Sequence, residues 1–98
     1  MTDIFAAIRT RGGGWDFSKP LEQQLLWKEH AAFMDGLAEQ GFFLLVGPLE
    51  GTRDVLLIMR GKSVEEIEER LADDPWTENG FLTTARIHPW TLRIGALP

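Results

Sequence analysis

Residues 42–60 have the sequence FFLLVGPLEGTRDVLLIMR, and they set the architecture expected for the whole chain. Two apolar runs, Phe42–Val46 and Val55–Arg60, are separated by Gly47-Pro48 and a short polar turn, as in two buried strands joined by a loop. Both runs are apolar at odd and at even positions. Side chains alternate between the two faces of a strand, so each of these strands has two faces that avoid water.

The residues before this stretch predict a strand followed by a helix. Alternation of apolar residues over Ile4–Arg9 is typical of a strand. The segment Glu22–Gln40 has apolar residues at helical spacing and predicts an amphipathic helix. Pro20 suits the first turn of that helix, and Gly41 suits its C-terminal cap.

The residues after it predict a second helix and two further strands. Ser63, with Glu66 three positions later, matches a capping box, and Pro75 ends the helix that begins there. Strands are expected over Leu82–His88 and, as a short fifth strand, over Thr91–Ile94. The order β-α-β-β-α-β predicts a ferredoxin-like α+β fold, an antiparallel sheet with two helices on one face.

The two-sided strands also predict an assembly. Two helices can cover only one face of the sheet, and the other face is most simply covered by a second copy of the chain. We therefore expect a homodimer in which sheet packs against sheet.

Composition limits the classes of function. The 98 residues suffice for one domain, expected over residues 1–98. The net charge is −5 and the basic residues are scattered, which argues against nucleic acid and anionic membranes as partners. No apolar run is long enough to span a membrane. The absence of cysteine excludes disulfides and a cysteine nucleophile, and with no visible secretion signal we expect a cytoplasmic protein.

His30 is the first candidate for chemistry because it lies on the apolar stripe of the predicted first helix. An imidazole there must find a hydrogen-bond partner or it costs stability. It is also the side chain whose charge changes most easily near neutral pH. The position fits either a satisfied core histidine or a proton-transfer group in a pocket.

Asp74 is the second candidate. It follows the predicted second helix, where the helix dipole disfavours a negative charge and raises the pKa of a carboxyl group that no cation or donor answers. Paired with an imidazole, Asp74 would hold one ring tautomer and stabilise the protonated form. The alternative is structural: Asp74 caps a new turn that has Pro75 in its first position.

Aromatic and basic residues supply candidates for substrate contacts. Trp15, Trp27 and Trp76 could form walls around a small planar ligand, although core filling explains them equally well and is the expected role of Trp90. Arg9, together with Arg11, could clamp a carboxylate or phenolate, but for either residue alone a solvated surface position is the favoured interpretation.

The remaining features of the sequence say less about function. His88 shares its strand parity with Thr84 and Arg86 and is expected to be an exposed edge-strand residue. The segment Gly12–Gly14 matches no phosphate-binding fingerprint and is expected to be a mobile lid or a flexible turn. No residues have the close spacing of metal ligands, so no metal and no cofactor are expected.

Taken together, several motifs resemble the YCII-related (YciI-like) proteins. They occur in the order Trp27–Met34, Glu39–Phe42, Gly47–Leu49, Asp74–Trp76 and Pro89–Thr91. The resemblance implies a dimeric α/β barrel, in which the sheets of two ferredoxin-like units meet across a two-fold axis. It also implies an active site made of a histidine on the first helix and the aspartate of the DP step, which are His30 and Asp74 in this chain.

A few relatives are linked to dehydrochlorination or similar lyase chemistry on small aromatic compounds. We therefore predict a small-molecule enzyme that moves protons without a cofactor, by elimination or isomerisation, with His30 as acid–base and Asp74 as its orienting partner. The alternatives are a non-catalytic dimeric module that binds a small ligand or a protein, and a structural dimer with a dry cleft.

Overall fold

The computed structural model describes residues 3–97, so residues 1, 2 and 98 of the expected domain lie outside the described part of the chain. Four strands form one antiparallel sheet in the order β2-β3-β1-β4. Their bounds are β1 (Ile4–Arg11), β2 (Phe43–Pro48), β3 (Asp54–Arg60) and β4 (Leu82–Pro89). This strand order confirms the ferredoxin-like α+β fold.

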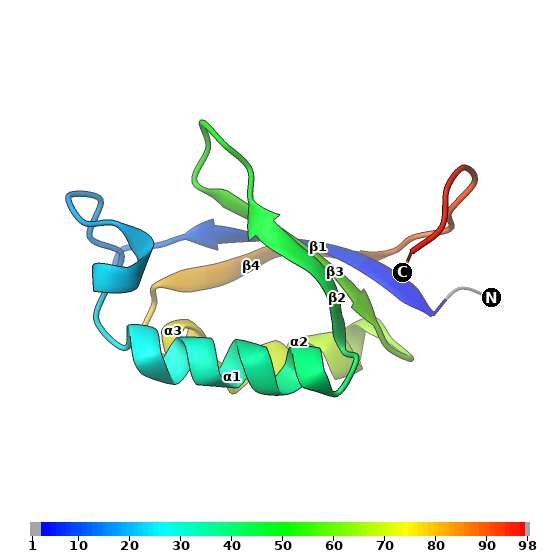
Figure 1. Ribbon diagram of the computed structural model, residues 1–98, viewed down its shortest axis with the longest axis horizontal. Coiled ribbons are helices and arrows are strands. Elements are labelled where there is room, and N and C mark those ends of the chain that lie inside the picture. Colours follow the sequence, from blue (N-terminus) through cyan, green and yellow to red (C-terminus); the bar gives the residue numbers. More distant parts are fainter. Residues whose placement is uncertain (1–2, 98) are drawn as a thin grey trace.

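The helices α1 (Trp27–Glu39) and α2 (Val64–Ala72), with the short α3 (Pro75–Glu78), lie on one side of the sheet (Figure 1). The predicted caps are present. Gly41 ends α1 with φ of +79°, a conformation that glycine adopts without strain. The hydroxyl of Ser63 accepts a hydrogen bond from the Glu66 N–H at the start of α2.

The helix expected over Glu22–Gln40 begins later than predicted. A 3₁₀ turn, η1 (Leu21–Gln23), comes first, and α1 starts only at Trp27. Between them Leu26 has φ of +65°, in the left-handed region that costs a branched side chain free energy. Apolar spacing continues across this break, which is why periodicity alone placed the helix start too early.

The end of the chain also differs from the prediction. Residues 91–94 form no strand, so the described residues contain four strands rather than five. Trp90 is 41% exposed and does not fill the core. The backbone N–H of Trp90 donates to the Ile4 carbonyl and thereby ties the chain to β1 as it leaves the sheet.

A bulge in β4 changes which of its residues face the helices. Ile8 pairs with Arg86, but the next residue of β1, Arg9, pairs with Thr84, so Ala85 is left without a partner in the register. Paired residues share a face. Thr84 therefore lies on the helix side and Arg86 on the other, against the shared parity that the sequence suggested.

Two clusters of buried side chains lie under the helices. The main core combines strands β1, β2 and β3 with α2 and consists of Phe5, Ala7, Phe42, Phe43, Leu57, Met59, Ile67 and Leu71. The aromatic cluster lies beside it and consists of Trp15, Trp76, Phe81 and Leu82.

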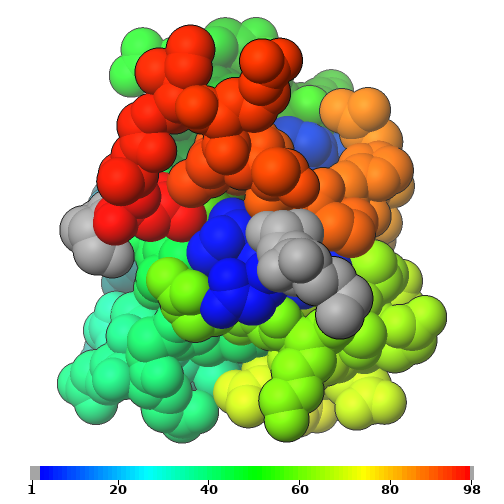
Figure 2. Space-filling model, turned by 90° about the vertical axis from the view of Figure 1, so that its right-hand side faces the viewer, coloured from blue at the N-terminus to red at the C-terminus, as the bar shows by residue number. Residues whose placement is uncertain are grey.

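The opposite face of the sheet carries no helix. Ala6, Ile8 and Leu56 line a groove of about 230 Å³ there, with Arg86 and His88 at its side. The C-terminal segment lies on this side of the sheet, away from the helices (Figures 1 and 2). No helix within residues 3–97 is long and apolar enough to cross a membrane.

Candidate functional site

His30 and Asp74 meet in the structure. The first turn of α1 places the His30 ring so that Nδ1 lies 2.8 Å from Oδ1 and 2.9 Å from Oδ2 of Asp74. Asp74 is also the N-cap of α3, because its Oδ1 accepts a hydrogen bond of 3.0 Å from the Trp76 N–H. The two interpretations of Asp74, helix cap and partner of the histidine, therefore hold together.

Arg9 completes this buried network from β1. Its Nη1 donates to Asp74 Oδ2 at 3.0 Å, and its Nη2 donates to the Thr77 hydroxyl. That hydroxyl in turn donates to the Leu71 carbonyl at 2.8 Å. Arg9 is 1% exposed, so the interpretation favoured for this residue alone, a solvated surface position, is wrong.

The signal for Arg9 was present in the sequence, since it shares strand parity with the core residues Phe5 and Ala7. Thr77 was missed, because nothing local to a threonine in a short helix indicates a partner 68 positions away.

The charges of the network are balanced. Burial raises the pKa of Asp74, but hydrogen bonds from His30 and the Trp76 N–H, the charge of His30 and the hydrogen bond from Arg9 together hold it below its ordinary value of 3.8. Burial lowers the pKa of Arg9, and Asp74 opposes that effect. Asp74 is thus a carboxylate and Arg9 a guanidinium at neutral pH. The raised pKa that the dipole of α2 would cause is absent because donors surround the carboxylate.

Tryptophans surround the histidine ring. His30 stacks on Trp76 with 3.7 Å between ring centroids and 10° between planes. Trp15 meets Trp76 edge to face at 5.0 Å, and Trp27 lies 6.0 Å from His30. The Trp76 indole N–H donates to the Leu25 carbonyl at 2.8 Å, which fixes the plane on which His30 stacks.

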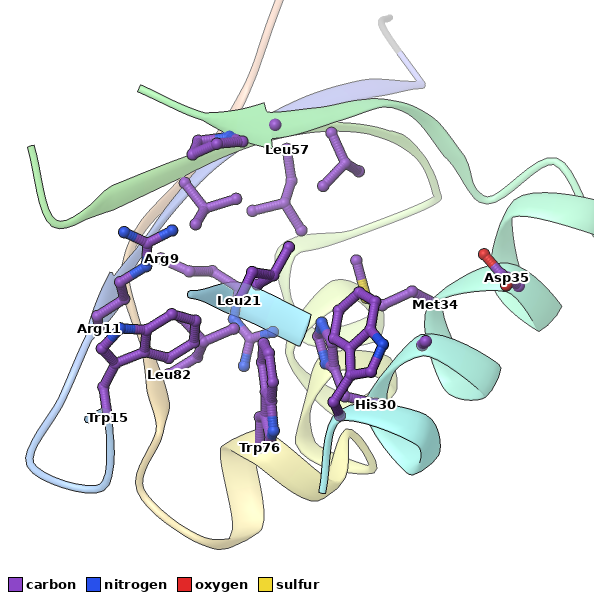
Figure 3. A pocket seen from close by; sticks show the side chains of 16 residues that line it. Arg9, Arg11, Trp15, Leu21, His30, Met34, Asp35, Leu57, Trp76 and Leu82 are labelled. Atoms are coloured by element: carbon purple, nitrogen blue, oxygen red, sulfur yellow. The ribbon is translucent and has the colours of Figure 1, made fainter. Parts of the chain in front are cut away.

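A pocket of about 310 Å³ opens over these rings (Figure 3). This volume is at the small end of the range for ligand sites. Of the residues predicted to make the site, Asp74 lies beneath the pocket without lining it, whereas those lining it are His30, Arg9, Trp15, Trp27 and Trp76. The walls also include Arg11, which the sequence grouped with Arg9 as a possible clamp for an anion, and Asp35, which the sequence did not assign to the site.

Another buried polar residue, Gln24, holds the loop that borders the pocket. Its side-chain amide donates to the carbonyls of Asp16 and Lys19 at 2.7 and 3.0 Å, and its oxygen accepts from the Asp16 N–H at 2.9 Å. Sequence reasoning missed Gln24, which lay inside the helix expected there. The partners of Gln24 are backbone groups of the loop itself, and no pattern of side chains in the sequence indicates such contacts.

The glycine segment is a turn packed against residues 79–81. The N–H groups of Gly12 and Gly14 donate to the carbonyls of Phe81 and Gly80 at 2.9 and 3.1 Å. A Cβ on Gly14 would lie 2.4 Å from Cδ1 of Phe81, so the approach requires glycine. The close packing of this turn against residues 79–81 places Trp15 in edge-to-face contact with Trp76.

The second histidine takes no part in the site. His88 is exposed on the edge strand β4, as the sequence predicted. Within residues 3–97 no three histidine or carboxylate side chains are grouped so that they could hold a metal ion.

The sheet order and the helices on one face define the chain as a ferredoxin-like α+β protein, and a pocket lined in part by α1 opens beside the buried network. The chain belongs to the YCII-related domain family, whose model matches residues 18–91. Among solved structures it is similar to 5-chloro-2-hydroxyhydroquinone dehydrochlorinase (TftG) from Burkholderia phenoliruptrix AC1100, in complex with 2,5-dihydroxybenzoquinone. The identity is 21% with a TM-score of 0.59, over 90% of this chain and 93% of that one. The comparison with curated proteins gave no significant match.

Proposed function

We propose that this protein is a small-molecule enzyme in which His30 and Asp74 form an acid–base pair. The pair would move a proton on a small, planar organic substrate without a cofactor. The observation that carries the proposal is the anchoring of His30 Nδ1 on a buried carboxylate at the wall of an open pocket. Such a pair is typical of a histidine that transfers protons through its other nitrogen.

The hydrogen bonds set the direction of proton transfer. A carboxylate only accepts, so Nδ1 must carry a hydrogen, and the neutral ring then has its lone pair on Nε2. Nε2 has no partner among the described residues, and it takes the substrate proton. Asp74 stabilises the imidazolium that forms, and Arg9 holds Asp74 in place. General acid–base catalysis of this kind contributes about 10²–10⁴-fold to a rate.

Elimination or isomerisation fits this pair, because the proton taken at one atom can be returned to a leaving group or to another carbon. The structural similarity to a dehydrochlorinase supports elimination on a hydroxylated ring, and the three tryptophans of the pocket support a flat substrate. Trp15, Trp27 and Trp76 would hold the ring of the substrate, and Arg9, which also lines the pocket, would contact the substrate beside them.

We also propose that the chain works as a homodimer through the face of the sheet that carries no helix. Ile8 and Leu56 lie opposite each other on that face, Leu45 beside them is 51% exposed, and Ile94 of the C-terminal segment is 95% exposed. Apolar side chains placed this way are typical of surfaces that a second subunit covers. Sedimentation at micromolar concentration should give a dimer, and a clean monomer would contradict this.

The experiment that tests the acid–base pair has two parts. In ¹⁵N NMR of the histidine rings, neutral His30 should carry its proton on Nδ1, and Asp74→Asn should remove that preference. In a chloride-release assay on chlorinated hydroxyhydroquinones, His30→Asn should lower turnover by about 10²-fold or more while ligand binding persists.

His88→Asn is the matched control, because it removes an exposed histidine from the same fold. A proton on Nε2 of His30 would contradict the mechanism. Binding without turnover in the wild-type chain would instead indicate a non-catalytic ligand-binding module, because the aromatic walls alone can hold a ring.

A further inference from the structure

The pocket contains one cation that no anion balances. Arg11, from the end of β1, lines the pocket and lies over the Trp15 ring, with its guanidinium carbon 4.5 Å from the ring centroid. It forms no ion pair with any residue in the described range 3–97, and its buried Nε has no hydrogen-bond partner there. Buried donors without partners are rare in proteins, and each asks for an explanation.

The other charges of the pocket are already accounted for. Arg9 is neutralised by Asp74, so the network beneath His30 carries no net charge while the imidazole is neutral. The carboxylate that lines the pocket, Asp35, is exposed and lies on α1 at the opposite end from Arg11 (Figure 3). The pocket is therefore positive at the Arg11 end, although the chain as a whole carries a charge of −5.

Arg11 and His30 stand at the two ends of one row of groups in contact. Arg11 covers Trp15, Trp15 touches Trp76, and Trp76 carries His30 on its face. Figure 3 shows Trp76 between these two ends of the pocket. A flat ligand that enters the pocket thus has a cation at one end and a proton acceptor at the other.

We propose that Arg11 binds an ionised oxygen of the substrate, a carboxylate or a phenolate, and that the reacting hydrogen of the same molecule points to His30. The position of the reacting hydrogen rests on the proposed function; the oxyanion site does not. When the C–H or O–H bond of the substrate breaks, the proton forms the Nε2–H bond of His30. The electron pair stays on the substrate, where it is delocalised over the conjugated ring, and in an elimination a pair leaves with the chloride ion. Arg11 is then a specificity-determining residue, because it holds the ionised oxygen and so orients the ring of the substrate toward His30.

The test is a binding measurement with matched anionic and neutral ligands. Isothermal titration calorimetry compares benzoate with benzamide, and picrate with picramide, at low ionic strength. Wild type should prefer at least one anion over its neutral partner. Arg11→Gln should weaken binding of that anion by about 10- to 100-fold and leave the amide within about twofold. Preference for benzoate identifies a carboxylate site, and preference for picrate identifies a phenolate site.

Arg53→Gln is the matched control. Arg53 also lies over an aromatic ring, that of Phe17 at 4.6 Å, but it does not line the pocket. The anion preference should survive this change. Equal affinity of wild type for both anions and their amides, or an equal loss in Arg53→Gln, would overturn the proposal.

Two further variants keep the test decisive. If circular dichroism shows that Arg11→Gln is unfolded, Arg11→Lys retains the charge without the planar fork, and it should weaken anion binding less than tenfold. In His30→Asn the anion preference should persist although turnover is lost. A chain that prefers anions through Arg11 but moves no proton would therefore contradict the proposed function and leave the oxyanion site standing.

Discussion

The main core and the neighbouring site lie under the same helices, but the main core consists of apolar side chains whereas the site contains buried charged ones. The main core contains no buried polar side chain, and its strands and α2 contribute only apolar groups. A few residues along the same sheet, the network of Arg9, His30 and Asp74 buries three ionisable groups among tryptophans. One end of the helix layer is held by apolar burial, and the other is held by the ion pairs and hydrogen bonds that join Arg9, His30 and Asp74.

Strand β1 shows how the chain makes this change within one element. Phe5 and Ala7 point into the main core, and Arg9, two residues further along the same face, enters the site. Burial alone therefore does not show whether a residue of this fold has a structural or a functional role. The partners of a buried group decide its role.

The largest expected effect comes from removing the centre of the polar network. Asp74→Ala should lower the free energy of unfolding by about 3–5 kcal/mol, because it leaves the Arg9 charge buried without its partner. Ile67→Ala in the main core should cost about 2–5 kcal/mol through the cavity it leaves. Denaturant unfolding measures both values.

A double-mutant cycle separates the two mechanisms. In an Arg9→Met background the cost of Asp74→Ala should shrink by more than 1 kcal/mol, whereas the cost of Ile67→Ala should stay the same. Equal costs of Asp74→Ala in both backgrounds would show that the two regions do not differ in the way described.

Acid should weaken the site before it weakens the main core. The pKa of Asp74 is lowered in the folded chain, so between that pKa and the ordinary 3.8 the unfolded chain binds more protons. The stability that Asp74 contributes is complete above the ordinary value and is lost as pH falls through the folded pKa. Unfolding free energies measured from pH 6 to pH 2 should therefore fall less steeply in Asp74→Asn than in wild type.

Asp3→Asn serves as the comparison, because the pKa of Asp3 is also lowered but its ion pair with Arg60 is exposed to solvent. It should keep most of the acid sensitivity of wild type. The interpretation would be wrong if Asp3→Asn flattened the profile more than Asp74→Asn did.

The smallest effect is expected at two glycines. Gly14→Ala should destabilise the chain by about 1–3 kcal/mol, because the added Cβ would meet the Phe81 ring and push Trp15 off Trp76. Gly36→Ala, on the open side of α1, should stabilise it by about 0.5–1 kcal/mol. Thermal unfolding, with benzoate affinity as a second measure for Gly14→Ala, tests both. A loss at Gly36 as large as that at Gly14 would contradict the packing argument.

Much of the fold could be predicted because the signals are local. The apolar runs of β2 and β3, the cap at Ser63 and the glycine at position 41 each depend on neighbours in sequence. The start of α1 could not be predicted, because the left-handed Leu26 leaves no mark on apolar spacing.

The candidate site was predictable only in part. His30 and Asp74 were named, and they do meet, but they are 44 positions apart and spacing alone would not have joined them. Gln24 and Thr77 were missed because the partners of Gln24 lie across a loop and the partner of Thr77 lies on β1, far away in the sequence. The catalytic and binding roles of His30, Asp74 and the pocket residues stay predictions until the variants are measured.

The bulge in β4 bears on how the length of this strand can vary. Ala85 is the bulge residue of β4 and has no partner on β1, whereas the residues on both sides of it pair with β1 in regular register. Loss of Ala85 would leave each remaining pair with its present partner. A deletion farther along β4 would exchange the inner and outer side chains of the residues between the deleted position and Ala85. Across natural variation, single-residue gaps in β4 should therefore collect at Ala85.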